Sequence, residues 1–151
     1  MVRLLHIVVC IVVLTIGGTS TDAIAKISHK IYLTSIENNG IPDTKPQLEF
    51  TCSDKIYAVI EVSGLSKKKH QLEAVWTDPK GKKRERTAVP LYVSQAQTRT
   101  WVWLKLHPGA GASVISAFDP AYGLEEFIGQ WSISIFIDRE LLDKKQFSVL
   151  C

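Results

Sequence analysis

The segment GQWSISIFI, residues 129–137, alternates apolar and polar side chains along most of its length. Its apolar positions are Trp131, Ile133, Ile135 and Ile137. Its polar positions are Gln130, Ser132 and Ser134. A period of two residues is typical of a β-strand that buries one face, and no other segment of the chain shows it so regularly. The pattern predicts a strand over residues 130–137 that lies at the centre of a sheet.

The rest of the chain also predicts strands, because no helical period is sustained for more than two turns. We expect them over residues 27–36, 56–62, 70–77, 82–93 and 99–106, and around residues 145–150. Glycine, asparagine and proline mark turns at residues 38–43 and 78–81. The segment 82–93 is polar and contains Pro90, which suits the edge of a sheet. This spacing favours an all-β fold, an antiparallel sandwich of about seven strands.

Two segments combine a strand with a characteristic turn or closing pattern. One is AVWTDPKGK, residues 74–82, and the other is GQWSISI, residues 129–135, which FSV follows at residues 147–149. Macroglobulin-type and fibronectin-type domains have similar strand-and-turn segments. The resemblance implies an immunoglobulin-like fold in which Trp76 is the buried tryptophan of the third strand. It also implies an exported bacterial domain that serves as a binding, spacer or assembly module, although a fold alone does not dictate the task.

The first 25 residues have the features of a secretory signal peptide. Arg3 supplies a positive charge, residues 4–16 are mostly apolar, and residues 23–25 offer the small side chains that signal peptidase needs. The apolar run is shorter than the roughly 20 residues of a membrane-spanning helix. We therefore expect cleavage before Lys26 and a single β-sandwich domain over residues 26–151. The mature form would not span the membrane, and it would be secreted, periplasmic or held at the cell surface.

The cysteines favour a disulfide. The chain has three, and Cys10 would leave with the signal peptide. Cys52 and Cys151 remain as an even pair in an exported chain, which is typical of a disulfide. Each alternates with neighbouring aromatic or aliphatic residues, which predicts that both sulfurs point inward. The alternative is two unrelated thiols.

The formal charge of the chain is mild. It carries 18 lysines and arginines against 15 aspartates and glutamates, a net charge of +3. Such a balance does not argue for a nucleic-acid partner. The basic residues gather in residues 67–70 and 80–86, where we expect turns. These clusters are either solvated loop tips or a site for an anionic partner such as lipid headgroups or an acidic polysaccharide.

The sequence offers no catalytic constellation. It lacks a Gly-x-Ser-x-Gly elbow and a glycine-rich phosphate loop before a helix. The histidines outside the expected signal peptide are too far apart to form a short-spaced ligand pair: His29, His70 and His107. Three carboxylates in one stretch lack the EF-hand pattern of a calcium site: Asp119, Glu125 and Glu126. We therefore expect no enzyme activity, no cofactor and no metal.

Two places are candidate binding sites. In WVWLKL, residues 101–106, Trp101, Trp103 and Lys105 share one face of a strand. If the aliphatic face lies in the core, the tryptophans form an outward platform for a sugar ring or a peptide. If the tryptophans lie in the core, the strand is buried on both sides. The second place is the long connection 107–128, which includes Tyr122 and serves either as a lid or as a recognition loop.

These features together predict an exported, non-enzymatic binding or structural module that assists assembly in the cell envelope. Its partner would be another envelope protein or a surface glycan, and not a nucleic acid. The alternative function is a secreted carbohydrate-binding or inhibitor module that uses Trp101 and Trp103. A sugar binder needs exposed tryptophans, whereas an assembly module needs an exposed strand edge or an apolar patch.

Overall fold

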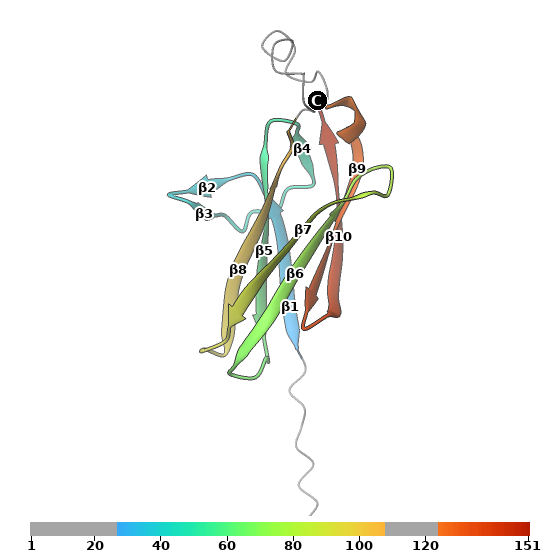
Figure 1. Ribbon diagram of the computed structural model, residues 1–151. Coiled ribbons are helices and arrows are strands. Elements are labelled where there is room, and N and C mark those ends of the chain that lie inside the picture. Colours follow the sequence, from blue (N-terminus) through green and yellow to red (C-terminus); the bar gives the residue numbers. More distant parts are fainter. Residues whose placement is uncertain (1–26, 108–123) are drawn as a thin grey trace, which may run out of the picture.

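The computed structural model describes residues 27–107 and 124–151, in which the chain folds into three β-sheets (Figure 1). One sheet has three antiparallel strands, in the order β1 (Ser28–Thr34), β5 (Lys55–Ser63) and β8 (Gln97–Lys105). Another has five, in the order β4 (Glu49–Thr51), β10 (Glu140–Leu150), β9 (Gly129–Ile137), β6 (Lys69–Thr77) and β7 (Lys83–Tyr92). A ribbon of β2 (Glu37–Asn38) and β3 (Ile41–Pro42) projects to one side, and a 3-10 helix, η1, spans Glu125–Phe127. The prediction of an all-β fold is confirmed.

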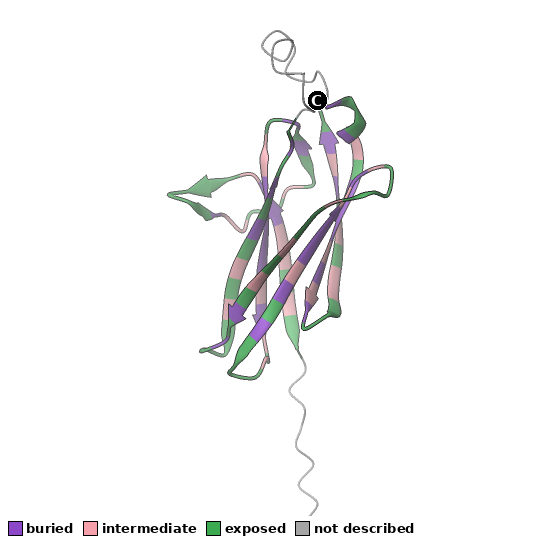
Figure 2. Cartoon of the chain, viewed as in Figure 1, coloured by how far each residue is buried: buried purple, intermediate pink, exposed green. Residues whose placement is uncertain are grey.

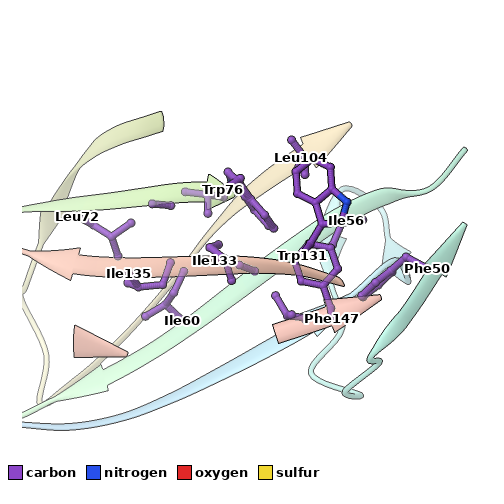
Figure 3. Packing of buried hydrophobic residues seen from close by; sticks show 14 of the residues in the cluster. Phe50, Ile56, Ile60, Leu72, Trp76, Leu104, Trp131, Ile133, Ile135 and Phe147 are labelled. Carbon is purple, nitrogen blue, oxygen red and sulfur yellow. The ribbon is translucent and has the colours of Figure 1, made fainter. Parts of the chain in front are cut away.

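The three-stranded and five-stranded sheets face each other and share one hydrophobic core. Buried residues recur along the strands of both sheets, which form the two layers of the sandwich (Figure 2). Aromatic rings fill one end of the core, where the ring centroid of Phe147 lies 5.9 Å from that of Trp76 and 6.1 Å from that of Trp131 (Figure 3). Trp76 is fully buried, as the resemblance to immunoglobulin-like domains implies.

Strand β9 lies at the centre of the five-stranded sheet, between β10 and β6, which confirms the prediction for residues 130–137. The four apolar side chains of its alternating pattern are buried: Trp131, Ile133, Ile135 and Ile137. The register places Trp76 of β6 opposite Ile133 and Ala74 opposite Ile135. The alternating pattern thus buries one side of β9 in the core and places the other on the outer surface of the sheet.

Two features of the five-stranded sheet differ from the predictions. Strand β4 runs parallel to β10, so the sandwich is not purely antiparallel and has eight strands rather than about seven. Because β4 has only three residues, alternation alone does not identify it as a strand. Strand β10 begins at Glu140 rather than near Lys145, because Asp138 and Arg139 turn the chain tightly with φ of 50° and 75°.

The sequence predicts only a turn at residues 38–43, but the chain forms a hairpin there. Asn39 and Gly40 have φ of 52° and 78°, and Glu37 pairs with Pro42 across the ribbon. Two consecutive positive φ values are typical of an Asn-Gly hairpin turn. The flanking strands have two residues each, too few for their alternation to distinguish them from a longer turn.

The turn at residues 78–81 is confirmed. Gly81 N donates a hydrogen bond to Asp78 O at 2.9 Å, and the Asp78 carboxylate accepts bonds from the backbone of Lys80 and Lys82 at 2.9 and 2.8 Å. Arg84 Nε donates to the same carboxylate at 2.6 Å. After this turn, β7 forms an edge of the five-stranded sheet, as the polar pattern of residues 82–93 predicts.

The disulfide between Cys52 and Cys151 is present, with the two Cα atoms 5.2 Å apart. It follows from the parallel register of β4 and β10, which pairs Phe50 with Val149 and so brings the residues after them side by side. Cys52 is buried, whereas Cys151, at the end of β10, is exposed as a residue. The bond ties the short edge strand β4 to the last strand of the chain.

Candidate functional site

Strand β8 carries the candidate site that the sequence indicates most strongly. Val102 and Leu104 are buried, so the aliphatic face of the strand lies in the core. Trp101 and Trp103 point the other way and keep 37% and 47% of their surface exposed, and Lys105 is exposed beside them. Of the two arrangements that the sequence allows, the structure therefore shows the outward platform. A binding role for these three residues stays a prediction.

A lysine from the neighbouring strand β5 lies over this platform. The register pairs Tyr57 with Trp103 and Lys55 with Lys105. The Nζ atom of Lys55 lies 4.7 Å from the ring centroid of Tyr57 and 4.8 Å from that of Trp103. Such a cation–π contact is worth about 0.5–1 kcal/mol at an exposed site. Sequence pattern alone does not identify Lys55 as part of the site, because the contact depends on the pairing of two distant strands.

The β2–β3 ribbon covers part of the same face. Arg99 Nη2 donates a hydrogen bond to Pro42 O at 2.6 Å, and Lys55 Nζ lies 4.0 Å from the carboxylate of Glu37. Both contacts hold the ribbon against the outer side of the three-stranded sheet. Tyr57 is only 2% exposed although it points away from the sandwich core, and its hydroxyl has no hydrogen-bond partner among the described residues. The base of the ribbon thus contacts two residues of this sheet, Lys55 and Arg99, which lie on the same side of the sheet as the tryptophans.

We define the tryptophan face as the outer surface formed by Lys55, Trp101, Trp103 and Lys105, beneath which Tyr57 is buried. It combines two exposed aromatic rings with two ammonium groups. In the described part of the chain, β8 has a hydrogen-bonded neighbour on one side only. The backbone of β8 is therefore open to a further strand at the same place where its tryptophans are exposed.

The connection 107–128, the second candidate place, is described only at its two ends. Tyr122 lies outside the described residues, so its place in a binding site stays a prediction. At the C-terminal end of the connection, Leu124 and Phe127 are buried, and Trp131 Nε1 donates a hydrogen bond to Phe127 O at 2.6 Å. This end of the connection packs on one end of the core. The choice between a lid and a recognition loop stays a prediction, because residues 108–123 lie outside the described residues.

Three polar residues that the sequence does not link meet at the other end of the sandwich. His70 Nδ1 lies 2.7 Å from Asp138 Oδ2, and His70 Nε2 lies 3.0 Å from Ser66 O and 3.4 Å from Ser66 Oγ. They line a cleft of about 950 Å³. The order of the groups resembles a hydrolase triad, but Nε2 lies closer to the serine carbonyl than to its hydroxyl. We interpret His70 as a structural residue that joins the β5–β6 loop to the β9–β10 turn.

Asp138 should make the stability of this end of the sandwich depend on pH. A hydrogen bond from Gln71 N at 2.9 Å, with a second from His70, holds the pKa of Asp138 below its usual value of 3.8. A carboxyl group whose pKa is lower in the folded chain stabilises the fold above its unfolded pKa. That stabilisation is lost as the pH falls through the folded pKa.

We therefore expect Asp138→Asn to lower the urea midpoint at neutral pH, and the difference from the wild type to shrink as the pH falls below about 4. Asparagine tolerates the positive φ at this position, so the turn itself is preserved. Glu140→Gln, at an exposed carboxylate two residues further on, is the control. A difference between Asp138→Asn and the wild type that stays constant down to strongly acidic pH would contradict this account.

The described residues contain no group of three or more histidine, cysteine, aspartate or glutamate side chains that could hold a metal ion. Glu126, one of the carboxylates near a possible calcium site, pairs instead with Arg84 at 2.7 Å, and Asp119 lies outside the described ranges. In the same part of the chain, no helix has both the length and the apolar character needed to cross a membrane.

Comparisons with known proteins bear on the fold alone. No model of a protein family matches the chain, and no curated protein sequence matches it. Among solved structures, the alkylpurine DNA glycosylase AlkC from Pseudomonas fluorescens is similar to this chain. The match covers 84% of this chain and 31% of the glycosylase, at 9% identity and a TM-score of 0.52. A β-glucosidase from Listeria innocua matches 82% of this chain with 16% of its own length, at 11% identity and a TM-score of 0.44.

The CARDB domain of a Pyrococcus furiosus protein matches 82% of this chain with 89% of its own length, at 9% identity and a TM-score of 0.43. The present chain thus spans about a third of the length of the glycosylase and about a sixth of that of the glucosidase. At such low identity, the likeness to part of the glycosylase shows an all-β fold and carries no information on ligand or activity.

Proposed function

We propose that this chain is an exported, non-enzymatic binding module of the cell envelope, and that the tryptophan face is its binding surface. The proposal includes a signal peptide over residues 1–25, a single domain over residues 26–151 and an immunoglobulin-like arrangement of the sandwich. One observation carries it: Trp101 and Trp103 are exposed on the side of β8 that faces away from the core.

The exposed tryptophans favour a binding role because they lie outside the hydrophobic core and so do not serve to pack it. Tryptophan is highly buried on average, and it is enriched among the few residues that dominate protein interfaces. Trp101 and Trp103 are two positions apart on one strand, so their side chains leave the same face about 7 Å apart. Lys55 and Lys105 keep this apolar surface hydrated and add positive charge at its margin. A partner that covers both rings would remove a large apolar area from water.

The open edge of β8 favours another envelope protein as the partner. An extended segment of that protein could pair with the backbone of β8 as an added strand, while its side chains contact Trp101 and Trp103. Exposed strand edges are usually protected in proteins that act alone.

A carbohydrate-binding module is the second candidate. Aromatic rings side by side are suited to stacking on sugar rings, and the ammonium groups of Lys55 and Lys105 could donate hydrogen bonds to sugar oxygens. This alternative uses the same rings but does not need the edge of β8. Titration with purified glycans, followed by tryptophan fluorescence, distinguishes the two, because only the carbohydrate-binding alternative predicts that a sugar alone shifts the emission of the exposed rings.

The test compares the mature chain, residues 26–151, with its Trp101→Ala/Trp103→Ala variant. The wild-type chain, immobilised, should retain a partner from an envelope extract, and the purified partner should bind the double variant at least roughly 30-fold more weakly, since a buried interface tryptophan is worth about 2 kcal/mol or more. Tyr92→Ala is the matched control, because it removes an exposed aromatic ring from the other sheet.

Unchanged binding by the double variant would show that the tryptophan face is not the binding surface. Equal losses in the double variant and in Tyr92→Ala would point to nonspecific adhesion of exposed rings. A fluorescence shift with a neutral glycan that the double variant lacks would instead favour the carbohydrate-binding alternative.

A further inference from the structure

The outer surface of the five-stranded sheet carries a trough whose chemistry differs from that of the tryptophan face. The register across β7, β6, β9 and β10 aligns Arg86, Val75, Ser134 and Lys144 in one row. These residues line a trough of about 910 Å³. The core-facing residues of the same strands point into the sandwich, so the trough lies on the opposite side of the molecule from the tryptophan face (Figure 1).

The trough is predominantly basic. Five of its lining residues are basic, namely Lys83, Arg84, Arg86, Arg139 and Lys144, and two are acidic, namely Glu73 and Glu85. The basic residues stand on both sides: Lys83 belongs to the edge strand β7, and Lys144 belongs to β10 on the far side. Positive charge on both walls attracts a negatively charged chain that lies between them.

Some of these charges are already paired, and others are available. Arg86 Nη2 lies 2.8 Å from the carboxylate of Glu73, and Arg84 pairs with Asp78 and Glu126. Within the described residues, no ion pair is formed by the remaining three basic residues, which are Lys83, Arg139 and Lys144. The unpaired charges therefore lie along the two walls and at one end of the trough, where a ligand can neutralise them.

The floor of the trough is neutral and offers small polar groups. Val75 is buried, and the side chains around it are half-buried: Thr77, Ser134 and Phe136. The four strands from β7 to β10 span roughly 14 Å, three strand spacings of about 4.8 Å. The register of β6 and β7 shifts at a bulge beside Trp76 and Thr77, and bulges increase the local twist of a strand pair. The width suits one extended chain lying along the strands.

We propose that this trough binds a linear acidic polysaccharide. The cationic walls would hold the acidic groups of the sugars, while the hydroxyls of Thr77 and Ser134 and the amide of Gln71 are placed to bond sugar hydroxyls. Phe136 adds one apolar surface for a sugar ring. This function goes beyond the tryptophan face and does not depend on it, because the two surfaces belong to different sheets.

Two other anionic partners fit the trough less well. A flat membrane surface would meet the charges of the rims but would not reach the hydroxyls of the floor. A single-stranded nucleic acid needs a series of aromatic rings on which successive bases stack, and the trough offers only Phe136 among its lining residues. The polysaccharide is the partner that uses both the walls and the floor.

The test measures binding of residues 26–151 to polygalacturonate by titration calorimetry, with neutral dextran for comparison. We expect binding to polygalacturonate and none to dextran, and the affinity should fall as NaCl rises from about 50 to about 300 mM, because salt screens the charges. Lys83→Glu/Lys144→Glu should weaken binding by roughly tenfold or more, because like charges now face the ligand. The neutral variant Lys83→Gln/Lys144→Gln should lower the affinity for polygalacturonate by a smaller factor. If the charge reversal impairs folding, this neutral variant provides the test instead.

The matched control is Lys30→Glu/Lys45→Glu, which makes the same change in net charge at exposed lysines away from the five-stranded sheet. It should leave the affinity within about twofold once salt screens distant charges. Equal weakening by the control would overturn the proposal, because attraction would then come from overall charge. So would failure of polygalacturonate to bind, or tighter binding to phosphatidylglycerol-containing vesicles or to oligo(dT) than to polygalacturonate.

Discussion

Trp131→Ala should lower the free energy of unfolding by about 3–5 kcal/mol, because it removes a fully buried ring and leaves a cavity. The ring stacks against Phe147, with centroids 6.1 Å apart, and its Nε1 donates a hydrogen bond to the carbonyl of Phe127 at 2.6 Å. Alanine would also leave that carbonyl without its partner. Small domains have only about 5–15 kcal/mol of stability, so the variant should be close to unfolding.

Urea midpoints of three alanine variants test this prediction. Trp76→Ala should be about as severe as Trp131→Ala, because Trp76 is also fully buried and packs on Phe147. Trp101→Ala should change the stability by less than about 1 kcal/mol, because an exposed ring leaves no cavity. Equal and severe losses at Trp101 and Trp131 would contradict the outward platform and would remove the basis of the proposed function.

Removing the disulfide should cost about 2–5 kcal/mol. Cys52 and Cys151 are 99 residues apart, and the chain-entropy model assigns about 4.7 kcal/mol to a closed loop of that size. We expect the largest structural effect at β4, a strand of three residues that only β10 holds in the sheet. Without the bond, β4 and the core residue Phe50 should open before the rest of the sandwich.

The measurement compares the wild type with Cys52→Ala/Cys151→Ser in urea at neutral pH. Alanine is chosen at the first position because Cys52 is buried, and serine at the second because Cys151 is exposed. Reduction of the wild type is the control, since it breaks the bond and leaves every side chain in place. In both the double variant and the reduced wild type, the backbone amides of β4 should exchange hydrogen faster than those of the other strands of the five-stranded sheet. A midpoint that moves in neither sample would show that the loop closure contributes nothing.

Much of the local structure could be predicted from the order of residues. The alternation in residues 130–137 located β9 and its central position, and the Asp-Pro-Lys-Gly segment located the turn before β7. The parity of Trp101, Trp103 and Lys105 also placed these residues on one face. These features depend only on neighbours in the chain, because side chains in a strand alternate wherever the strand is located.

The three-dimensional arrangement decided which of two possible faces is buried and which distant residues meet. Only the packing of β8 on the core turned Trp101 and Trp103 outward, and only the pairing of β5 with β8 brought Lys55 over them. The contact of His70 with Asp138, 68 residues away, and the basic trough likewise arise from register between distant strands. Alternation fixes which side chains share a face, but register depends on how the whole sandwich packs, and no local pattern contains that information.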